Sequence, residues 1–443
     1  MTGNNFEHYA DKLGAMIRIP TVSQHNDGDL TQFYIFHKEL ERLFPLVHAN
    51  LQKIDLNATL LFHWKGSDSS KRPILLMGHQ DIVPASDTGW VVPAYSGEVV
   101  DGKIYGRGAI DCKGHLFTIL QAIEELLEEN FVPPYDIYIE SSINEEIGGD
   151  GAPGAAKYLE EHGIKPAIII DEAGSIVDEP IAGIKKPFAV IGVTEKGYMD
   201  LKISAKGIGG HSSTPPRKTP AARLFAFANE IERKRPFKKV LLPEAKEMLQ
   251  CMGKSLPLPL RILFGNIGFF KPVILGLMPK VTPFGEAILA TTCCFTMMKG
   301  SDAPNVIAKE PYLVANLRTA LHQDCEASLA VMRKYAAKYD LKIEVLTKRE
   351  PSPMSDIHSK EYAYLTSCIK KQFPDVGVAP YIIMGATDCR HFSKLTSNAF
   401  RFSPLRTTVE QINSCHGVDE NVSVTALEEG VQFFKDFMKG WNM

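Results

Sequence analysis

Residues 135–172, YDIYIESSINEEIGGDGAPGAAKYLEEHGIKPAIIIDE, contain the pattern that decides the fold. The run 135–143 is rich in β-branched and aromatic residues and is typical of a strand. Residues 152–163 have helical character and end near a glycine, and 167–171 is a short apolar run typical of a buried strand. A strand, a helix and a strand in this order predict an α/β sheet covered by helices.

The same alternation precedes this stretch. PILLM at 73–77 is a short apolar run between polar residues, which predicts another buried strand. Over residues 115–130, apolar residues recur at helical spacing and acidic residues occupy the opposite face, which predicts an amphipathic helix. The N-terminal part of the chain therefore supplies several strands and helices to one sheet.

The pattern changes near residue 193. Residues 195–207 alternate apolar and polar side chains, which is typical of an antiparallel strand with one buried face. Further expected elements are a helix over 221–235, an irregular proline-rich and apolar segment over 236–290, a strand over 305–321, a helix over 325–339, a strand over 381–385 and a helix over 424–439. We therefore predict one α/β domain of residues 1–192 and 352–443, interrupted by an inserted α+β domain of residues 193–351.

The composition of the 443 residues excludes several classes of protein. Hydrophobic residues make up 44% and charged residues 23%, an ordinary globular mixture that argues against a disordered chain. The net charge of −3 argues against a nucleic-acid-binding protein, which normally carries a concentrated basic surface. The most apolar region, 261–278, is interrupted by Asn266 and Lys271, so neither a membrane span nor a membrane partner is expected.

The compartment is expected to be reducing. The start of the chain lacks a basic and then apolar pattern, so no secretory signal is expected. The eight cysteines include no C-x-x-C pair, which favours free, mostly buried thiols. We therefore expect a cytoplasmic protein.

Acidic and histidine residues recur where the predicted strands end. The carboxyl ends of parallel strands meet at one edge of an α/β sheet, where ligands and catalytic groups gather. A single acidic residue in a loop is usually only a solvated surface group, but here the pattern repeats in four consecutive elements. The residues are His79 and Asp81, then Asp111, then Glu145 and Glu146, then Asp171 and Glu172.

Imidazole and carboxylate together are ligands typical of zinc, for which cobalt or manganese can substitute. Asp111 follows a glycine-rich approach in GRGAIDCKG, and a carboxylate there could bridge two metal ions. Paired metals about 3.5–4 Å apart can activate water and polarise a carbonyl together. Glu145 and Glu146 are adjacent and point differently, so one can bind metal while the other accepts a proton.

Several motifs in sequence order resemble those of the co-catalytic di-zinc amidohydrolase and exopeptidase family. That family includes aminoacylase, glutamate carboxypeptidase, acetylornithine deacetylase, carnosinase and carboxypeptidase S. The motifs are HQDIVP (79–84), GRGAIDCKG (106–114), INEEIGG (143–149), DEAG (171–174), EKGYMDLKISAKGIGGHSSTP (195–215) and CHGVDENV (415–422). The loop DTGWVVPAYSGEV (87–99) and the segment 291–310 most resemble the carboxypeptidase S branch. The resemblance implies a zinc-exopeptidase-like domain with a mixed sheet, interrupted by a lid and dimerisation domain.

The resemblance also implies a role for each residue at the sheet edge. His79 and Glu172 would bind one Zn2+, His416 and Glu146 the other, and Asp111 would bridge them. Asp81 would orient His79, and Glu145 would be the general base. Asp171 is the alternative ligand if the strand ends one residue earlier. Related sequences commonly have an acidic residue after the bridging aspartate, joined by a cis peptide, and here that residue is Cys112.

The inserted domain resembles the part of the family that contacts the substrate. The resemblance makes His211 the oxyanion-stabilising histidine, which in dimeric members reaches the partner subunit's site, so a homodimer is expected. Asn305 and Arg318 would hold the substrate carbonyl and free carboxylate, since an arginine can bind carboxylate in a bidentate manner. Gly385 matches a loop where backbone approaches substrate. The segment 236–290 exceeds the simplest insert and could enlarge the lid, line a channel, form a subunit contact or add core.

The expected function is hydrolysis of an amide bond next to a free carboxylate, in a short peptide or a small molecule. A carboxypeptidase or dipeptidase and an N-acyl amino acid deacylase need the same metals and differ only in the acyl pocket. A metal-free binding protein on the same scaffold is the alternative from another class. Such a protein should have lost a ligand or the base, yet all of these residues are present.

Overall fold

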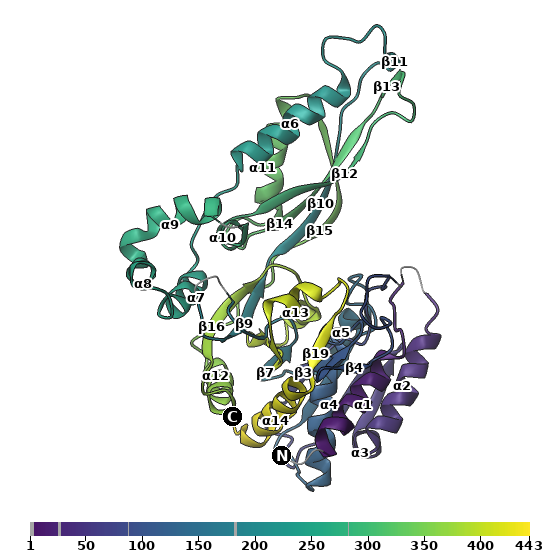
Figure 1. Cartoon of the computed structure of the whole chain (residues 1–443), viewed down its shortest axis with the longest axis vertical. Coiled ribbons are helices and arrows are strands. Elements are labelled where there is room, and N and C mark those ends of the chain that lie inside the picture. The colour runs from purple at the N-terminus through teal and green to yellow at the C-terminus, as the bar shows by residue number, and fades with distance from the viewer. Residues whose placement is uncertain (1–3, 25–27, 87, 181–183, 282) are drawn as a thin grey trace.

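The main sheet is built around three neighbouring parallel strands, β6, β3 and β7 (Figure 1). The structure is a computed structural model that describes residues 4–24, 28–86, 88–180, 184–281 and 283–443. Ten strands form it: β1 (Gln52–Leu56), β2 (Thr59–Trp64), β3 (Ile74–Met77), β6 (Ile137–Ser141), β7 (Ile168–Asp171), β8 (Ile176–Val177), β9 (Phe188–Glu195), β16 (Gly377–Ile383), β17 (Ala399–Arg401) and β18 (Arg406–Thr407). Parallel and antiparallel pairs both occur, so the predicted mixed sheet is confirmed.

The central strands are apolar on both faces because helices cover both. Ile74 and Leu76 pack into a core with the helices α1 (Asn4–Ile17), α2 (Thr31–Leu43), α3 (Pro45–Asn50), α4 (Lys113–Glu128), α12 (Lys360–Gln372) and α14 (Val424–Gly440). Leu75 and Met77 point to the other face, against α5 (Gly151–Glu161) and the short helix η1 (Asp388–Phe392). This two-sided burial explains why the strands are continuous apolar runs.

A second sheet lies apart from the first and forms the lid (Figure 1). Its antiparallel strands, in spatial order, are β12 (Thr292–Lys299), β14 (Tyr312–Thr319), β10 (Gly197–Ser204) and β15 (Lys342–Arg349). β10 alternates buried and half-buried side chains, as predicted, and α6 (Pro220–Lys234) and α11 (Cys325–Ala337) cover its buried face. At the far end of the lid, β11 (Gly210–His211) pairs with β13 (Val306–Ile307).

The strands of the main sheet come from residues 52–195 and 377–407, and those of the lid sheet from 197–349. The exact domain division stays a prediction. The remaining elements are the small sheet β4 (Val99–Val100), β5 (Lys103–Tyr105) and β19 (Asn421–Ser423), and the helix α13 (Val409–Ser414).

The prediction of an irregular segment over 236–290 is wrong. Four helices occupy it: α7 (Pro243–Gly253), α8 (Leu258–Gly265), α9 (Ile267–Val281) and α10 (Pro283–Leu289). Proline is compatible with the first turn of a helix, where its missing N–H has no partner to lose, and α7 and α10 begin at prolines. Their inner faces pack on β16 and β9 of the main sheet, although their sequence lies within the predicted inserted domain.

Candidate metal centre

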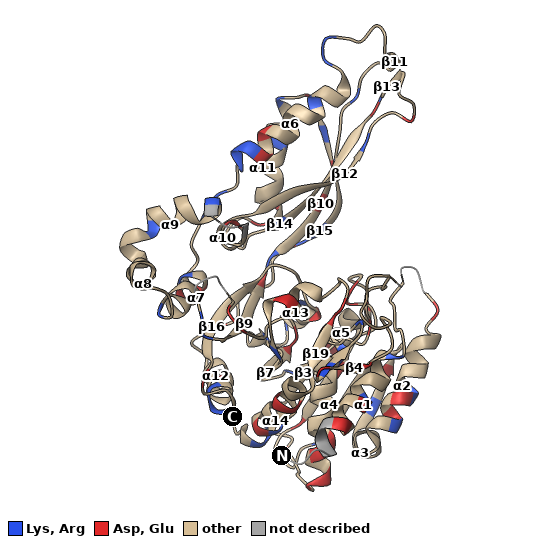
Figure 2. Cartoon of the chain, in the orientation of Figure 1, with Lys and Arg blue, Asp and Glu red and all other residues tan. Residues whose placement is uncertain are grey.

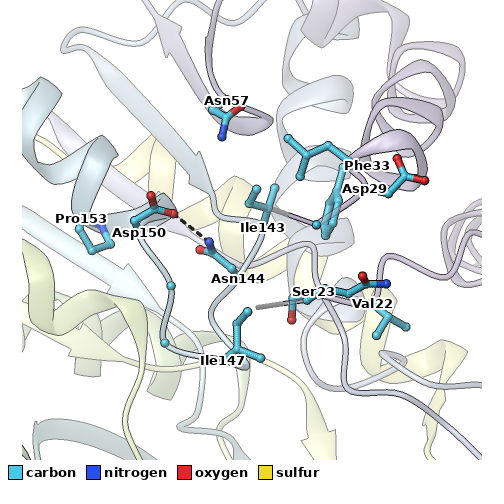
Figure 3. Close-up of a pocket in the computed structure, with 15 residues that line it drawn as sticks. Val22, Ser23, Asp29, Phe33, Asn57, Ile143, Asn144, Ile147, Asp150 and Pro153 are labelled. Carbon is cyan, nitrogen blue, oxygen red and sulfur yellow. Dashed lines mark hydrogen bonds between the residues drawn. The ribbon is translucent and has the colours of Figure 1, made fainter. Parts of the chain in front are cut away.

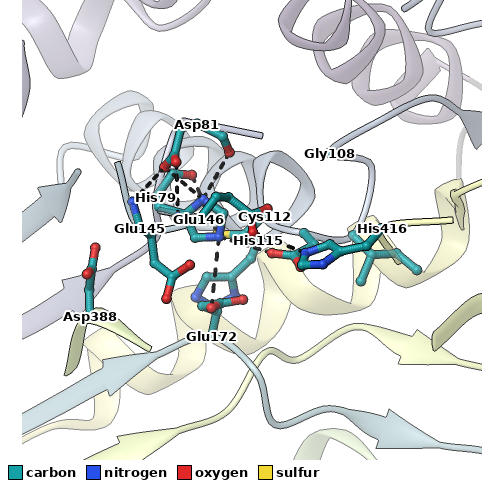
Figure 4. Close-up of polar contacts among 12 residues, drawn as sticks. His79, Asp81, Gly108, Cys112, His115, Glu145, Glu146, Glu172, Asp388 and His416 are labelled. Carbon is teal, nitrogen blue, oxygen red and sulfur yellow. Dashed lines mark hydrogen bonds and ion pairs between the residues drawn. The ribbon is translucent and has the colours of Figure 1, made fainter. Parts of the chain in front are cut away.

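The ligand-type residues of the sequence motifs meet at one edge of the main sheet (Figure 4). His79 follows β3, the Glu145–Glu146 pair follows β6, and Glu172 follows β7. Asp111 lies just before α4. His416, which is far away in sequence, arrives in the loop between α13 and β19.

The Asp111 carboxylate lies between the two imidazoles. Its Oδ1 is 3.0 Å from His79 Nε2, and its Oδ2 is 3.0 Å from His416 Nε2. Glu146 Oε2 is 3.1 Å from His416 Nε2, and Glu172 Oε1 is 3.9 Å from His79 Nε2. The five side chains therefore form two groups that share Asp111, which is the arrangement expected for two neighbouring metal ions.

The donor set fits a divalent metal. Ligand atoms of His79, Asp111 and Glu146 all lie within 4.8 Å of one another. Glu146 Oε1 is buried and has no hydrogen-bond partner, so it is free to coordinate. Nitrogen and carboxylate oxygen donors in a small cluster suit zinc, manganese or cobalt.

Two other residues at this edge are less suitable as ligands. Both oxygens of Asp171 accept backbone hydrogen bonds, from Glu172 N at 2.9 Å and Cys389 N at 2.8 Å, which favours Glu172 over Asp171 as the ligand. Cys112 Sγ also lies near His79 and Glu172. Burial raises the pKa of the Cys112 thiol, so it stays protonated and packs as a small neutral group after the cis Asp111–Cys112 peptide.

Asp81 organises the residues around it from a fully buried position. Its Oδ1 lies 3.3 Å from His79 Nδ1 and accepts a hydrogen bond from Glu145 N at 3.1 Å. Its Oδ2 accepts a hydrogen bond from Glu146 N, also at 3.1 Å. The Asp81 carboxylate therefore fixes the loop that holds both glutamates, and it orients the imidazole together with the Asp81 backbone carbonyl, which lies 3.0 Å from His79 Nδ1.

Glu420 is a second organising carboxylate, which the sequence analysis does not single out. Its oxygens accept hydrogen bonds from Gly108 N, Ile110 N and Asp111 N at 2.8–3.1 Å. It also forms a buried ion pair with Arg107 at 2.7 Å, and Arg107 donates to Gly417 O at 2.7 Å. This network joins the Asp111 loop to the loop of His416, whose φ of 61° is a strained value held by the surroundings.

Glu145 lies beside the two groups (Figure 4), and it lines the same cavity as Asp111, Glu146, Glu172 and His416. Burial raises the pKa of its carboxyl well above the ordinary value, and the nearby Asp388 and Asp81 add to the rise. Burial also raises the pKa of Asp388 to about 7, although Asp388 accepts a hydrogen bond from Ser142. A carboxylate with a raised pKa is a better proton acceptor near neutral pH.

The predicted lid residues separate into two places. His211 and Asn305 are together and exposed at the far end of the lid, where Ser212 N donates to Asn305 O at 3.0 Å. That end is remote from the main sheet in Figure 1. Arg318 is near the other end of β14, with its guanidinium carbon 4.7 Å from the centre of the Tyr198 ring.

Arg349 is a further residue that sequence reasoning misses. It pairs in register with Tyr198 on β10, and Tyr198 also pairs with Arg318 on β14, so one face of the sheet holds Arg318, Tyr198 and Arg349 side by side. A Cβ at Gly148, which has a φ of 62°, would lie 2.6 Å from Arg349 Nη1. Gly148 therefore lets a guanidinium approach the loop that contains Glu145.

Residues 75–440 match the sequence profile of Peptidase family M20/M25/M40. The chain belongs to this family. It is thus a metallohydrolase of the exopeptidase and amidohydrolase type, as its resemblance to the di-zinc enzymes implies.

Relatives in this peptidase family cover almost the whole chain. A probable carboxypeptidase S-like 2 of Dictyostelium discoideum is 34% identical over 440 residues, which are 97% of this chain and 84% of the relative. The human N-fatty-acyl-amino acid synthase/hydrolase PM20D1 is 33% identical over 437 residues, which are 97% of this chain and 87% of the relative. The solved M20 family metallo-carboxypeptidase Sso-CP2 from Sulfolobus solfataricus has a TM-score of 0.72 at 18% identity, with 97% of this chain and 98% of that chain covered, which shows a shared fold.

The candidate metal centre opens into a cavity of about 610 Å³. Its lining includes Asp111, Glu145, Glu146, Glu172 and His416, and also Gly385. The remaining wall is largely apolar and includes Val190, Met252 of α7, Phe284 of α10, Tyr381 and Met384. The Phe284 and Tyr381 rings stack with their centres 6.1 Å apart.

A second cavity of about 640 Å³ is lined by Ile143, Asn144 and Ile147, which belong to the loop that contains Glu145 (Figure 3). Its two acidic side chains are in local contacts. Asp29 accepts from Thr31 N at 2.9 Å, and Asp150 accepts from Asn144 Nδ2 at 3.1 Å. No histidine or cysteine is among the described residues that line it, whereas Asp111, Glu146, Glu172 and His416 line the cavity described above.

Proposed function

We propose that this member of the peptidase family hydrolyses N-acyl amino acids with apolar acyl groups, using two Zn2+ ions. The observation that carries the proposal is the apolar wall of the cavity beside Glu145, formed by α7, α10 and β16. An acyl chain that leaves water for this wall gains about 0.8 kcal/mol per methylene group.

In this proposal His79 and Glu172 would hold one Zn2+ and His416 and Glu146 the other, and Asp111, whose two oxygens face the two imidazoles, would serve both ions. Zinc in such a site polarises a carbonyl and acidifies water, and Co2+ or Mn2+ can replace it. Two observations support this donor set. Glu146 Oε1 is buried without a hydrogen-bond partner, and the two oxygens of Asp111 each lie 3.0 Å from one imidazole nitrogen, of His79 and of His416.

The protein's own side chains transfer a proton, bind the substrate carboxylate and hold the loops of the site in position. Glu145 accepts a proton from the attacking water and returns it to the leaving amine nitrogen. Arg318 and Arg349 bind the free carboxylate of the amino acid, because a guanidinium makes paired hydrogen bonds to a carboxylate. Asp81 and Glu420 keep the reacting loops in position through their backbone hydrogen bonds.

A carboxypeptidase or dipeptidase is the alternative, since relatives bear such names. The ammonium group or polar backbone of a peptide would need hydrogen-bond acceptors at the end of the cavity away from the metals. Among the described lining residues outside the metal centre there is no carboxylate; the polar side chains are hydroxyls and the Asn413 amide, and apolar side chains such as Val190, Met252 and Phe284 predominate. This lining favours an acyl chain over a peptide.

A homodimer through the lid is part of the proposal. His211 and Asn305 lie at the exposed end of the lid, away from the metal centre of their own chain, which supports action at the site of a partner subunit. His211 would then stabilise the developing oxyanion. A cytoplasmic location is also proposed, and the eight free cysteines are compatible with it.

The test compares kcat/KM of the zinc-loaded enzyme for one amino acid carrying acyl chains of two to sixteen carbons, and for dipeptides. We expect kcat/KM to rise about fourfold per methylene until the cavity is full, and turnover to stop when a chelator removes zinc. Val190→Trp should reduce turnover of long acyl chains more than that of acetyl substrates. Flat dependence on chain length, with dipeptides as the best substrates, would overturn the assignment.

A further inference from the structure

Helices α8 and α9 present an unusually apolar outer surface. No residue of α8 is buried. Phe269 is 82% exposed, and five further side chains are 41–60% exposed: Leu258, Leu260, Ile262, Val273 and Leu277. In Figure 1 the two helices project at the left of the molecule, between the main sheet and the lid. An apolar patch of this kind on the exposed surface of a protein marks an interaction site.

The charges around the patch all have one sign. No acidic residue occurs between Glu247 and Glu286, whereas Lys254, Arg261, Lys271 and Lys280 lie in that interval. All four basic side chains are exposed. Figure 2 accordingly shows α8 and α9 in tan and blue, without red.

The geometry favours a position on a membrane surface over one across it. Among the described residues, no single helix is long and apolar enough to span a bilayer. α8 and α9 have sufficient length and hydropathy only as a pair, and the pair is bent by 108°. Short helices with apolar faces, flanked by basic residues, lie in the interface of a bilayer with their apolar side chains among the acyl chains.

We propose that α8 and α9 dock this protein on an anionic lipid bilayer. The basic residues complement the negative headgroups, and Phe269 and Leu277 enter the apolar layer. The sequence expectation of no membrane partner depended on the absence of a span, which a surface helix does not need. A second copy of this chain fits the patch less well, because a two-fold contact would bring the same four positive charges against each other.

The patch and the proposed acyl cavity lie on opposite sides of one buried apolar cluster. Ile267 and Ile274, on the inner face of α9, belong to the same apolar cluster as Met252, which lines the cavity. Phe284 of α10 packs against that cluster and lines the cavity too. The docked α9 therefore lies one apolar layer away from the proposed acyl cavity, so the bilayer would hold acyl substrates near that cavity. This step rests on the proposed function, whereas docking itself does not.

Vesicle binding tests the docking without any turnover. The Glu145→Gln protein is floated with vesicles of phosphatidylcholine alone and with vesicles containing about one-third phosphatidylserine. We expect binding to the anionic vesicles that weakens as salt is raised. Arg261→Glu with Lys271→Glu should weaken it by about thirtyfold or more, and Phe269→Ser by about tenfold or more.

Ile208→Ser is the matched control, because Ile208 is 88% exposed on the lid, and it should bind as the parent does. Phe269→Ser in the active enzyme should hydrolyse soluble acetyl substrates at the parental rate, which shows that its fold is intact. No binding to anionic vesicles would overturn the proposal. So would self-association that Phe269→Ser abolishes without any vesicle binding. Vesicle binding by a protein that does not hydrolyse acyl amino acids would instead refute only the proposed function.

Discussion

Replacing Asp81 by asparagine isolates the role of the buried carboxylate behind the metal centre. The native side chain accepts hydrogen bonds from Glu145 N and Glu146 N, both at 3.1 Å, and contacts His79 Nδ1 at 3.3 Å. Asparagine keeps the shape but replaces one acceptor oxygen with an NH2 donor. One of the two backbone N–H groups then faces another donor and loses its partner.

The magnitude follows from these contacts. A buried N–H without a partner costs about 1–3 kcal/mol of folding free energy. The loss of negative charge behind the His79 imidazole should also weaken zinc binding by about 10–100-fold. We therefore expect a lower urea midpoint for metal-free Asp81→Asn protein, an unchanged m-value, and weaker zinc binding in competition with a chromophoric chelator.

Asp136 offers a matched control away from the metal centre. It contacts His63 Nε2 at 2.9 Å and accepts a hydrogen bond from Gly66 N at 2.8 Å, which is a similar carboxylate, imidazole and backbone arrangement. Asp136→Asn should lower stability but leave zinc affinity unchanged. Equal zinc affinities for Asp81→Asn, Asp136→Asn and the parent would refute the positioning role of Asp81.

Four further predictions address the base, the partner subunit, the carboxylate site and acid stability. Glu145→Gln should retain zinc by metal analysis but lose about 10²–10⁴-fold in kcat, and a loss below tenfold would exclude it as the base. Mixing inactive His211→Ala and Glu145→Gln subunits should restore roughly a quarter of the wild-type activity by random exchange; no recovery, once exchange is shown by a tagged pull-down, would mean that the histidine acts within its own chain. Arg349→Met should raise KM about tenfold or more for substrates with a free carboxylate but not for their amides, and equal effects on both would contradict a carboxylate contact. Burial lowers the pKa of His115 to about 3, so this group contributes stability above pH 6.5 that is lost as the pH falls from 6.5 towards 3, by about 1.4 kcal/mol per pH unit. The urea midpoint of metal-free His115→Gln protein should therefore fall less steeply than that of the parent as the pH is lowered. Parallel plots of urea midpoint against pH for the two proteins would refute this role.

The ends of the central strands can be predicted from the sequence because their signals are local. A short apolar run such as 168–171, bounded by polar residues, has few alternatives to a buried strand. The acidic or histidine residue that follows it must then lie at the carboxyl edge of the sheet. His79, Glu146 and Glu172 therefore come together as expected.

Contacts that depend on strand pairing or on distant loops give no such signal. Arg349 faces Tyr198 only because β15 pairs with β10 in one register, and an edge strand with few buried residues leaves that register unspecified in the sequence. Glu420 lies in a quoted motif, but its backbone partners become visible only in three dimensions. The helices over 243–289 give a weak signal in the sequence, because proline lowers helix propensity in a helix interior, as at Pro272 and Pro279 of α9. The sequence does not show which of the other prolines lie in a first turn, where proline is tolerated.

The hydrogen bonds of Glu420 also determine when the metal centre can form during translation. Glu420 receives the backbone hydrogen bond of Asp111 across 309 residues of sequence. A ribosome adds about 5–20 residues per second, so the Asp111 loop waits about 15–60 s after its own synthesis for this partner. His416 is made only four residues before Glu420. A nascent chain that stops short of residue 416 therefore has neither a fixed Asp111 loop nor its second imidazole, and we expect no hydrolytic activity before residue 420 has been translated.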